Sequence, residues 1–187
     1  MNIEGLKLTT DYLSETQATD LLRNIDASPW LDDLKRRVQH YGYKYDYRAR
    51  AVDTSMFLGP LPDWAGALAQ RLYKEKVFEA VPDQVIVNEY LPGQGIAPHV
   101  DCEPCFAGTI AGLTLGSGCL MDFTHLDEPV KISHHLSVRS LVVLQGEARY
   151  RWRHGIAGRK TDLIDGRRVP RGRRVSLTFR NVILQQY

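Results

Sequence analysis

The latter part of the chain is broken into short β-rich runs, and this rhythm limits the folds open to the chain more than any other feature. The runs are separated by turns rich in Gly, Pro, Ser and Asp. Short strands at this spacing are typical of an antiparallel sandwich or barrel. The runs that we predict as strands are Val85–Leu91, Thr109–Leu115, Cys119–Thr124, Leu136–Leu144, Glu147–Arg153 and Arg173–Ile183.

Two helices are predicted before this β-rich part. Asp11–Ala27 carries Ser14 and Gln17 at the spacing of a capping box, followed by apolar residues at helical spacing. Pro62–Phe78 has a proline near its first turn and an apolar face. We interpret both helices as scaffold. Because the 187 residues contain no linker, repeat or low-complexity tract, we predict a single domain, residues 1–187.

The overall composition is that of a soluble globular protein, with 43% hydrophobic and 25% charged residues. No window approaches the roughly 18 apolar residues of a membrane span, and the N-terminus lacks the pattern of a signal peptide. The odd number of cysteines, three, favours a reducing compartment. We therefore expect a cytoplasmic protein without a membrane partner, and we predict a monomer.

The segment from Asn88 to Asp101 indicates a metal site. In an extended segment, residues i and i+2 point to the same side, so Asn88 and Tyr90 share one side, and His99 and Asp101 also converge. A histidine and a carboxylate held together supply two ligands of a 2-His-1-carboxylate site, which binds non-haem Fe(II) and leaves positions open. A His-x-Asp pair alone is more often a surface turn, so this hypothesis needs a third ligand elsewhere.

Near the C-terminus, the segment Arg174–Arg180 alternates between polar and apolar residues. An ordinary half-buried strand, with its polar side in water, shows the same pattern. If the polar side faces a cavity instead, Arg174 and Arg180 can bind a small dicarboxylate by paired hydrogen bonds. The segment by itself leaves both interpretations open.

Taken together, these motifs resemble the AlkB family of Fe(II)/2-oxoglutarate dioxygenases. The shared features are Asn-x-Tyr, His-x-Asp, a distant His-Gly and Arg-x5-Arg, and the resemblance continues through Arg36–Asp53, Leu115–Phe123 and Gly146–Ile156. Among animal members it is strongest to the dioxygenase domain of the eighth mammalian homologue, a tRNA wobble-uridine hydroxylase. The resemblance implies a mainly β fold, a double-stranded β-helix (jelly roll) over residues 85–183, with the N-terminal helices packed outside.

The resemblance also implies which residues bind the metal and the cosubstrate. His99, Asp101 and His154 would bind Fe(II). His154 is preferred to four other histidines because it follows a predicted strand and precedes the arginine run; those competitors are His40, His125, His134 and His135. O2 would take an open position on the iron, and 2-oxoglutarate would be bound by Asn88, Tyr90, Arg174, Ser176 and Arg180. Ser176 stands where the founding repair enzyme of the family has asparagine.

Tyrosines at every second position mark a candidate substrate contact, namely Tyr41, Tyr43, Tyr45 and Tyr47. This spacing predicts a strand with one aromatic face, and the arginines that flank it suit base stacking and phosphate contact. Cross-strand packing is the alternative, because tyrosine is also a good strand former. The segment resembles the nucleotide-recognition lid of the family. We therefore predict a lid over residues 36–60, with Arg37, Tyr41 and Tyr43 in contact with the substrate.

Charge and cysteine placement add three further observations. Ten basic residues lie between Arg149 and Arg174 against two aspartates, an excess of +8 that suits a polyanion or forms a solvated loop. Glu103 lies two residues after Asp101, where the founding repair enzyme has an acid and the eighth mammalian homologue has none. Cys102 and Cys105 have CxxC spacing without a second ligand pair for zinc, so we interpret them as incidental thiols.

The function implied by the resemblance is oxidative dealkylation of N-alkylated nucleobases in DNA or RNA. The base must be single-stranded or flipped out to reach the pocket. Hydroxylation of the alkyl carbon would give a hemiaminal that releases formaldehyde. One alternative is hydroxylation of a wobble uridine in tRNA. The other is a non-catalytic metal-binding jelly roll, which the paired Arg174 and Arg180 disfavour because a metal binder needs no dicarboxylate site.

Overall fold

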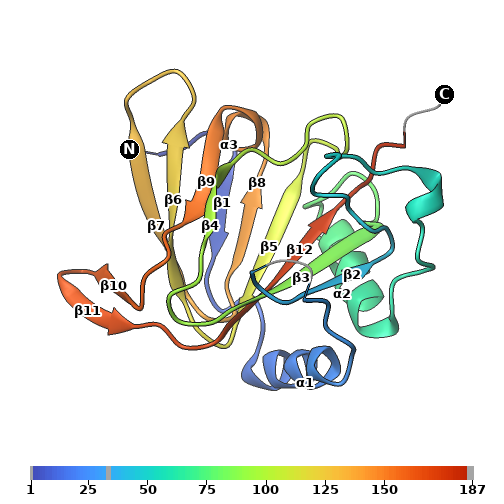
Figure 1. Ribbon diagram of the computed structural model, residues 1–187, viewed down its shortest axis with the longest axis horizontal. Helices are drawn as coiled ribbons and strands as arrows, with labels where there is room; N and C mark the ends of the chain where they lie inside the picture. The colour runs from blue at the N-terminus through green and yellow to red at the C-terminus, as the bar shows by residue number, and fades with distance from the viewer. Residues whose placement is uncertain (1, 33–34, 185–187) are drawn as a thin grey trace.

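Two antiparallel β-sheets face each other in the computed structural model, which describes residues 2–32 and 35–184 (Figure 1). The major sheet has the strand order β1 (Leu6–Thr9), β8 (Leu141–Leu144), β5 (Ile110–Leu115), β12 (Arg174–Arg180), β3 (Gln84–Tyr90) and β2 (Val38–Tyr41). The minor sheet has the order β4 (Ile96–His99), β9 (Trp152–Ile156), β6 (Cys119–His125) and β7 (Lys131–Leu136). This architecture confirms the predicted mainly β jelly roll.

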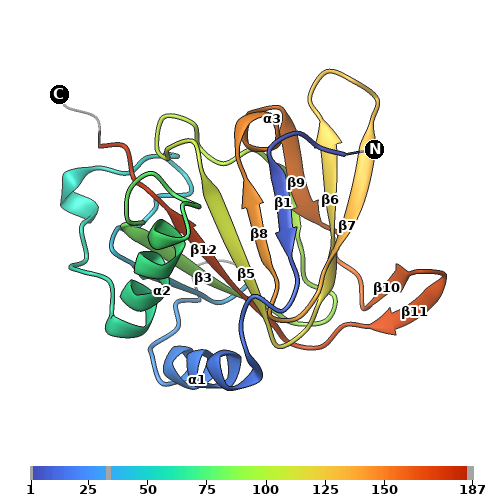
Figure 2. The same ribbon diagram turned by 180° about the vertical axis from the view of Figure 1, so that it is seen from behind.

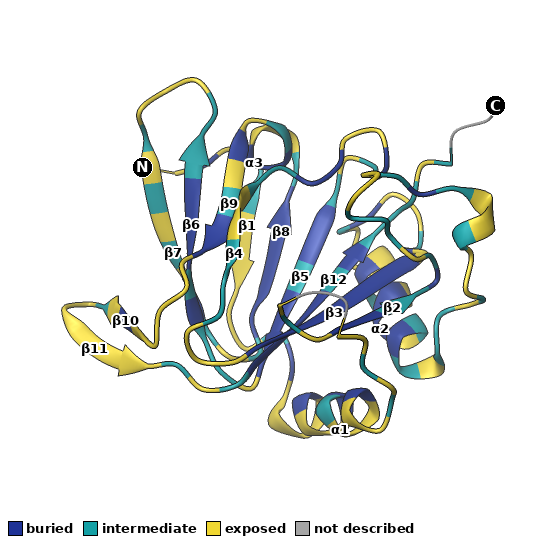
Figure 3. Cartoon of the chain, viewed as in Figure 1, coloured by how far each residue is buried: buried dark blue, intermediate teal, exposed yellow. Residues whose placement is uncertain are grey.

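A separate hydrophobic core lies on each side of the major sheet. On its outer side, Val175, Leu177 and Phe179 of β12 pack against the helices α1 (Glu15–Asp26) and α2 (Asp63–Lys74). Figure 2 shows α2 covering this side of β3 and β12. On its inner side, strands of both sheets enclose a second core that includes Ile110, Val142, Phe123 and Trp152. The strands of the major sheet are therefore mostly buried, as the colouring in Figure 3 shows. The predicted placement of the two helices on the outside of the jelly roll is confirmed.

The start of α1 follows its sequence signal closely. The Ser14 hydroxyl accepts a hydrogen bond from the Gln17 backbone at 3.1 Å, and the Gln17 side chain accepts one from the Ser14 backbone at 2.9 Å. This is the predicted capping box, which satisfies two backbone donors that the helix leaves free. In the described part of the chain, no helix has the length and apolar character needed to cross a membrane.

Two of the predicted strands are wrong in their boundaries or type. The predicted strand Leu136–Leu144 is two strands, β7 and β8, separated by a turn. Most of the predicted strand Glu147–Arg153 is instead the short helix α3 (Gly146–Tyr150), followed by β9. The consecutive residues Ala148 and Arg149 are both buried, which a helix packed end-on permits more readily than a strand with one exposed face. The sequence prediction also missed β1, β4, all of β7 except Leu136, and the hairpin of β10 (Thr161–Ile164) and β11 (Arg167–Pro170).

The predicted strand with one tyrosine face ends at Tyr41. Gly42 has φ +77, and a Cβ there would lie 1.8 Å from the carbonyl oxygen of Asp83. A turn at this position therefore requires glycine, and it redirects the chain. Beyond it, the predicted lid consists of loops with two isolated bridges, Tyr43 to Phe57 and Asp46 to Ala51. The prediction of one continuous strand is wrong.

Candidate active site

The three predicted iron ligands meet between the two sheets. His99 ends β4 and lies opposite His154 of the neighbouring β9, and Asp101 follows two residues after His99. The Nε2 atoms of His99 and His154 lie 3.3 Å and 3.7 Å from Oδ1 of Asp101, and the three donor atoms are all within 4.8 Å of one another. The competing histidines His40, His125, His134 and His135 do not join this cluster. The sheet register thus brings together the three residues that the resemblance implied as a facial triad.

The surroundings of each ligand favour its metal-binding form. Nδ1 of His99 lies 2.9 Å from the carbonyl oxygen of Ala97, so this nitrogen carries the proton and Nε2 is left with a lone pair. Burial lowers the pKa of His154 to about 4, only partly opposed by Asp101, so its imidazole is neutral at neutral pH. Burial would raise the pKa of Asp101, but the Arg180 guanidinium and the two histidines hold it well below its usual range. All three residues are therefore ready to bind a divalent cation.

The cluster is closed on one side and open on another. The Asp101 side chain is only 4% exposed, and its second oxygen, Oδ2, accepts a hydrogen bond from Nε of Arg180 at 2.9 Å. The His99 side chain is 36% exposed. A metal held here is fixed by three protein ligands and can be reached from the His99 side, which leaves room for cosubstrate and O2.

The polar side of β12 faces the interior, not solvent. Arg174 and Ser176 are buried, and they lie opposite Tyr90 and Asn88 of β3 in the sheet register. Partners in an antiparallel pair share a face, so these four side chains lie on the inner side of the major sheet. Asn88 also accepts a hydrogen bond from Nε of Arg36 at 2.8 Å. Of the two interpretations that the sequence left open, the interior one is correct.

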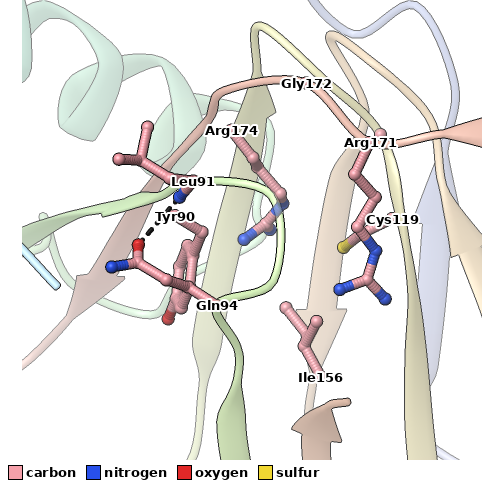
Figure 4. A pocket seen from close by; sticks show the side chains of 9 residues that line it. Tyr90, Leu91, Gln94, Cys119, Ile156, Arg171, Gly172 and Arg174 are labelled. Carbon is pink, nitrogen blue, oxygen red and sulfur yellow. Dashed lines mark hydrogen bonds between the residues drawn. The ribbon is translucent and has the colours of Figure 1, made fainter. Parts of the chain in front are cut away.

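Arg174 is a buried cation without an anion. It is 6% exposed, donates to Oγ1 of Thr114 at 3.0 Å, and has an Nε with no hydrogen-bond partner and no carboxylate partner among the residues that the structure describes. Its guanidinium lies 5.5 Å from the centre of the Tyr90 ring. Figure 4 shows both in a pocket that Gln94, Cys119, Ile156 and Arg171 also line. A buried unpaired guanidinium is costly, and a carboxylate in this pocket would remove that cost.

Two of the predicted substrate contacts, Arg37 and Tyr41, make contacts within the fold. Arg37 lies against the surface of β3, where its guanidinium donates twice to Glu89, at 2.7 Å each, and covers the Trp30 ring. Tyr41 lies on the helix side of the major sheet, with its ring edge-on to Trp64 at 5.2 Å. These placements do not support the prediction that Arg37 and Tyr41 contact a substrate.

Two tyrosines that the prediction left out lie closer to the metal cluster. The Tyr45 ring packs 5.3 Å from Phe106 and 4.9 Å from Tyr47. The guanidinium of Arg180, which is the hydrogen-bond partner of Asp101, covers the Phe106 ring at 4.6 Å. Tyr43 packs against Phe57, further along the same loop. The sequence signal for an aromatic wall was therefore present, but the turn at Gly42 changes which tyrosines form it.

The fold pairs four of the ten cations of the basic stretch with carboxylates and buries two others. Asp162 pairs with Arg159 and Arg171, while Arg173 pairs with Asp26 and Glu89. Arg151 pairs with Asp127, Arg149 is buried, and Arg174 lies in the pocket. Within residues 2–32 and 35–184, the cations of the stretch that remain exposed without an ion pair are Arg153, Lys160, Arg167 and Arg168. The local excess of +8 overstates the charge presented to a partner.

Cys102 and Cys105 form a disulfide in the turn that follows Asp101, and Cys119 is free and buried. The interpretation of the pair as incidental thiols did not foresee this bond. Glu103, between the two cysteines, is exposed and has no ion pair or hydrogen bond with the described residues through its carboxylate. The disulfide therefore closes a small loop that holds Glu103 two residues after the metal ligand Asp101.

The fold and the cluster define a class of protein, namely a double-stranded β-helix with a 2-His-1-carboxylate metal site. A family model described as the 2OG-Fe(II) oxygenase superfamily matches residues 31–180. The chain belongs to this superfamily and is one of its AlkB-like members, a dioxygenase that depends on Fe(II) and 2-oxoglutarate.

Similar sequences and structures agree with this assignment. Uncharacterized protein L905 of Acanthamoeba polyphaga mimivirus is 37% identical over 99% of this chain and 88% of its own length. The Arabidopsis thaliana protein named alkylated DNA repair protein ALKBH8 homolog is 36% identical over 97% of this chain. Mouse ALKBH8, named as a tRNA (carboxymethyluridine(34)-5-O)-methyltransferase, is 35% identical over 95% of this chain. The chain spans 59% and 30% of these two longer relatives.

The solved structure of OsALKBH1 superimposes with a TM-score of 0.70 at 16% identity, covering 97% of this chain and 98% of that structure. A prolyl-4-hydroxylase of Pseudomonas putida superimposes with a TM-score of 0.58 at 14% identity, covering 97% of this chain and 94% of that structure. At these identities the superpositions establish the fold alone. They confirm the predicted jelly roll.

The residues present fit both groups that the family requires. Three converging donors suit Fe(II), and the unpaired guanidinium of Arg174 suits one carboxylate of 2-oxoglutarate. When bound, Fe(II) would activate O2 as the oxidant, and oxidative decarboxylation of 2-oxoglutarate to succinate and CO2 would supply two of the electrons that O2 accepts. The Ala97 carbonyl orients the His99 imidazole, and the Arg174 guanidinium that would meet a carboxylate is buried between the two sheets.

Proposed function

We propose that this dioxygenase removes alkyl groups from N-alkylated nucleobases that carry a positive charge, such as N1-methyladenine and N3-methylcytosine. The observation that carries the proposal is the placement of Glu103. Its exposed carboxylate lies two residues from the iron ligand Asp101, in a loop closed by a disulfide, and no described residue neutralises it by an ion pair. A carboxylate in this position can accept a hydrogen bond from a cationic base, and charge strengthens that bond.

Aromatic side chains next to the cluster support a planar substrate. Tyr45, Tyr47 and Phe106 form a cluster of rings in edge-on and tilted contact, and Phe106 belongs to the loop that begins at Asp101. Stacking on aromatic rings is tolerant of base identity and stabilises a base taken out of a helix. We therefore assign these rings, together with Tyr43 at the edge of the same loop, to the wall of the base pocket.

The cosubstrate residues follow from the same geometry. We assign Arg174 to the distal carboxylate of 2-oxoglutarate, with Asn88, Tyr90 and Ser176 on the same inner face. Arg180 links the two parts of the site, because it already holds Asp101 and lies one strand length from Arg174. The exposed cations of the β10–β11 hairpin, Lys160, Arg167 and Arg168, suit contact with backbone phosphates.

A second candidate function is hydroxylation of a wobble uridine in tRNA. The observation that favours it is the identity of 35–36% to the two ALKBH8 relatives, one of which is named for a tRNA carboxymethyluridine. A uridine ring is uncharged near neutral pH, so it would lack the positive charge that strengthens a hydrogen bond to the Glu103 carboxylate.

One experiment separates the two functions. The purified protein with Fe(II), 2-oxoglutarate and O2 is offered single-stranded oligonucleotides carrying N1-methyladenine or N3-methylcytosine and, in parallel, tRNA carrying carboxymethylated wobble uridine. Formaldehyde and the product bases are quantified by mass spectrometry, with His154→Ala as the inactive control. We expect formaldehyde and restored adenine or cytosine. Hydroxylated uridine without formaldehyde from either methylated base would replace the first proposal by the second.

A further inference from the structure

Arg149 is the largest fully buried side chain among the described residues, at 2% exposure, and no carboxylate pairs with it. Its guanidinium is instead surrounded by backbone oxygens. Nη1 donates to Asp101 at 2.9 Å, Nη2 donates to Cys102 and Phe106 at 3.3 Å each, and Nε makes a longer contact of 3.4 Å with Ala107. One side chain therefore serves four carbonyl groups of a single loop.

Stability alone is a poor reason to bury this cation. A buried charge loses its hydration, and an apolar side chain of similar volume is often as stabilising or more so. The loop from Asp101 to Ala107, however, turns several carbonyl oxygens inward, and each needs a donor. The outer edge of the loop is held separately, because Phe106 bridges to Val182, and Ala107 and Cys105 bond to the segment that follows β12. The Cys102 carbonyl also accepts from the backbone N–H groups of Cys105 and Phe106, whereas Arg149 is the donor to the carbonyls of Asp101, Phe106 and Ala107 among the described residues.

Arg149 lies close in sequence to one iron ligand and binds the loop that begins with another. Arg149 belongs to α3, which leads directly into β9, and the iron ligand His154 lies five residues further on. The loop that Arg149 binds begins with another iron ligand, Asp101. The Arg149 side chain is thus a direct connection between the segment that carries His154 and the segment that carries Asp101. Arg180 acts on the same ligand from the opposite side, by holding the carboxylate rather than the backbone.

We propose that Arg149 is a positioning residue for the iron site, which sets the backbone of Asp101 relative to His154 and thereby tunes metal affinity. It does not touch the metal or the substrate. Only a planar group with donors on three nitrogens can serve carbonyls spread along a loop, which explains why arginine and not lysine is used here. The proposal concerns iron binding, so it stands or falls independently of which base is the substrate.

The test compares Arg149→Met and Arg149→Lys with a matched control, Arg151→Met. Arg151 ends the same helix but pairs with Asp127 at the surface. Binding of Mn(II), a stand-in for Fe(II), is measured by calorimetry, the visible spectrum of the Co(II)-loaded protein reports the ligand geometry, and thermal unfolding of the metal-free protein reports stability.

We expect Arg149→Met to raise the Kd for Mn(II) about 10- to 100-fold, the usual range for residues that orient metal ligands, and to alter the Co(II) spectrum. Arg149→Lys, which can serve only some of the carbonyls, should fall between Met and wild type, and Arg151→Met should match wild type. A purely structural role would lower the melting temperature of the Arg149 variants and leave Mn(II) affinity and the Co(II) spectrum unchanged, which would overturn the proposal. If Arg149→Met does not fold, Arg149→Lys alone decides between these results.

Discussion

The residues that we assign to the cosubstrate lie on paired strands, whereas those that we assign to the substrate lie on loops. Arg174 and Ser176 are held opposite Tyr90 and Asn88 by a continuous hydrogen-bonded ladder in the centre of the major sheet. On the other side, residues 42–60 contain isolated bridges and a single turn of 3₁₀ helix, and Glu103 lies in a disulfide-closed loop. A site on rigid strands is positioned accurately, while loops can change without disturbing the scaffold. The arrangement fits an enzyme that keeps its cosubstrate and varies its substrate.

Removing an iron ligand should inactivate the cosubstrate side and the substrate side together, because turnover on both sides depends on the metal. His154→Ala leaves two of three protein ligands, so we expect succinate formation to fall below detection with or without a nucleic-acid substrate. Circular dichroism should show a folded domain. Near-wild-type activity of this variant would transfer the ligand role to His125, His134 or His135.

Arg174→Ala should damage the cosubstrate side alone. Truncating one partner of a buried, hydrogen-bonded charge pair costs about 2–5 kcal/mol, or about 30- to 5,000-fold, so the Kd for 2-oxoglutarate should rise by that factor. Arg174→Lys should rescue it only in part, because an ammonium group lacks the planar fork. Calorimetric titration with 2-oxoglutarate measures the effect, and Mn(II) affinity serves as the control. Unchanged 2-oxoglutarate binding in both variants would show that Arg174 does not bind the cosubstrate.

Glu103→Gln should damage the substrate side alone. A hydrogen bond to a charged group contributes about 1.5–3 kcal/mol, or about 10- to 150-fold, and we expect a loss of this size in kcat/KM for N3-methylcytosine. Consumption of 2-oxoglutarate without substrate should remain at the wild-type rate, because Glu103 is not an iron ligand. Equal activity of the variant and wild type on this base would mean that the carboxylate only faces solvent.

The tyrosines provide the smallest and most discriminating comparison. Stacking of a base on an aromatic ring contributes about 1–3 kcal/mol, so Tyr45→Ala should raise the KM for an oligonucleotide by about 5- to 150-fold. Tyr41→Ala removes a ring that packs against Trp64 on the helix side, so it should lower the melting temperature and leave this KM unchanged. The reverse pattern would restore the original sequence prediction for Tyr41. Steady-state kinetics and thermal unfolding of both variants distinguish the two.

Much of the cosubstrate side was predictable because its information is local. Alternation with a period of two places Arg174, Ser176 and Arg180 on one face of a strand whatever surrounds it, and His-x-Asp brings two ligands together by the same geometry. The capping box of α1 is likewise contained within four residues. Such patterns indicated a sandwich or barrel, two of the three metal ligands and a strand with both arginines on one face, whereas His154 and the jelly roll followed from the resemblance of the motifs in their order.

Tertiary structure decided what depends on partners far apart in sequence. The turn at Gly42, required by the approach of Asp83, moves Tyr45 and not Tyr41 to the iron side. Arg173 is neutralised by Asp26, 147 residues away, so a count of charges along the chain could not find the free cations. Arg149 falls within a run that alternates like a strand, yet forms a helix whose buried guanidinium meets carbonyls more than 40 residues earlier. Burial and ion pairing are properties of the packed molecule, and the physical reason is that both depend on which distant groups the fold brings into contact.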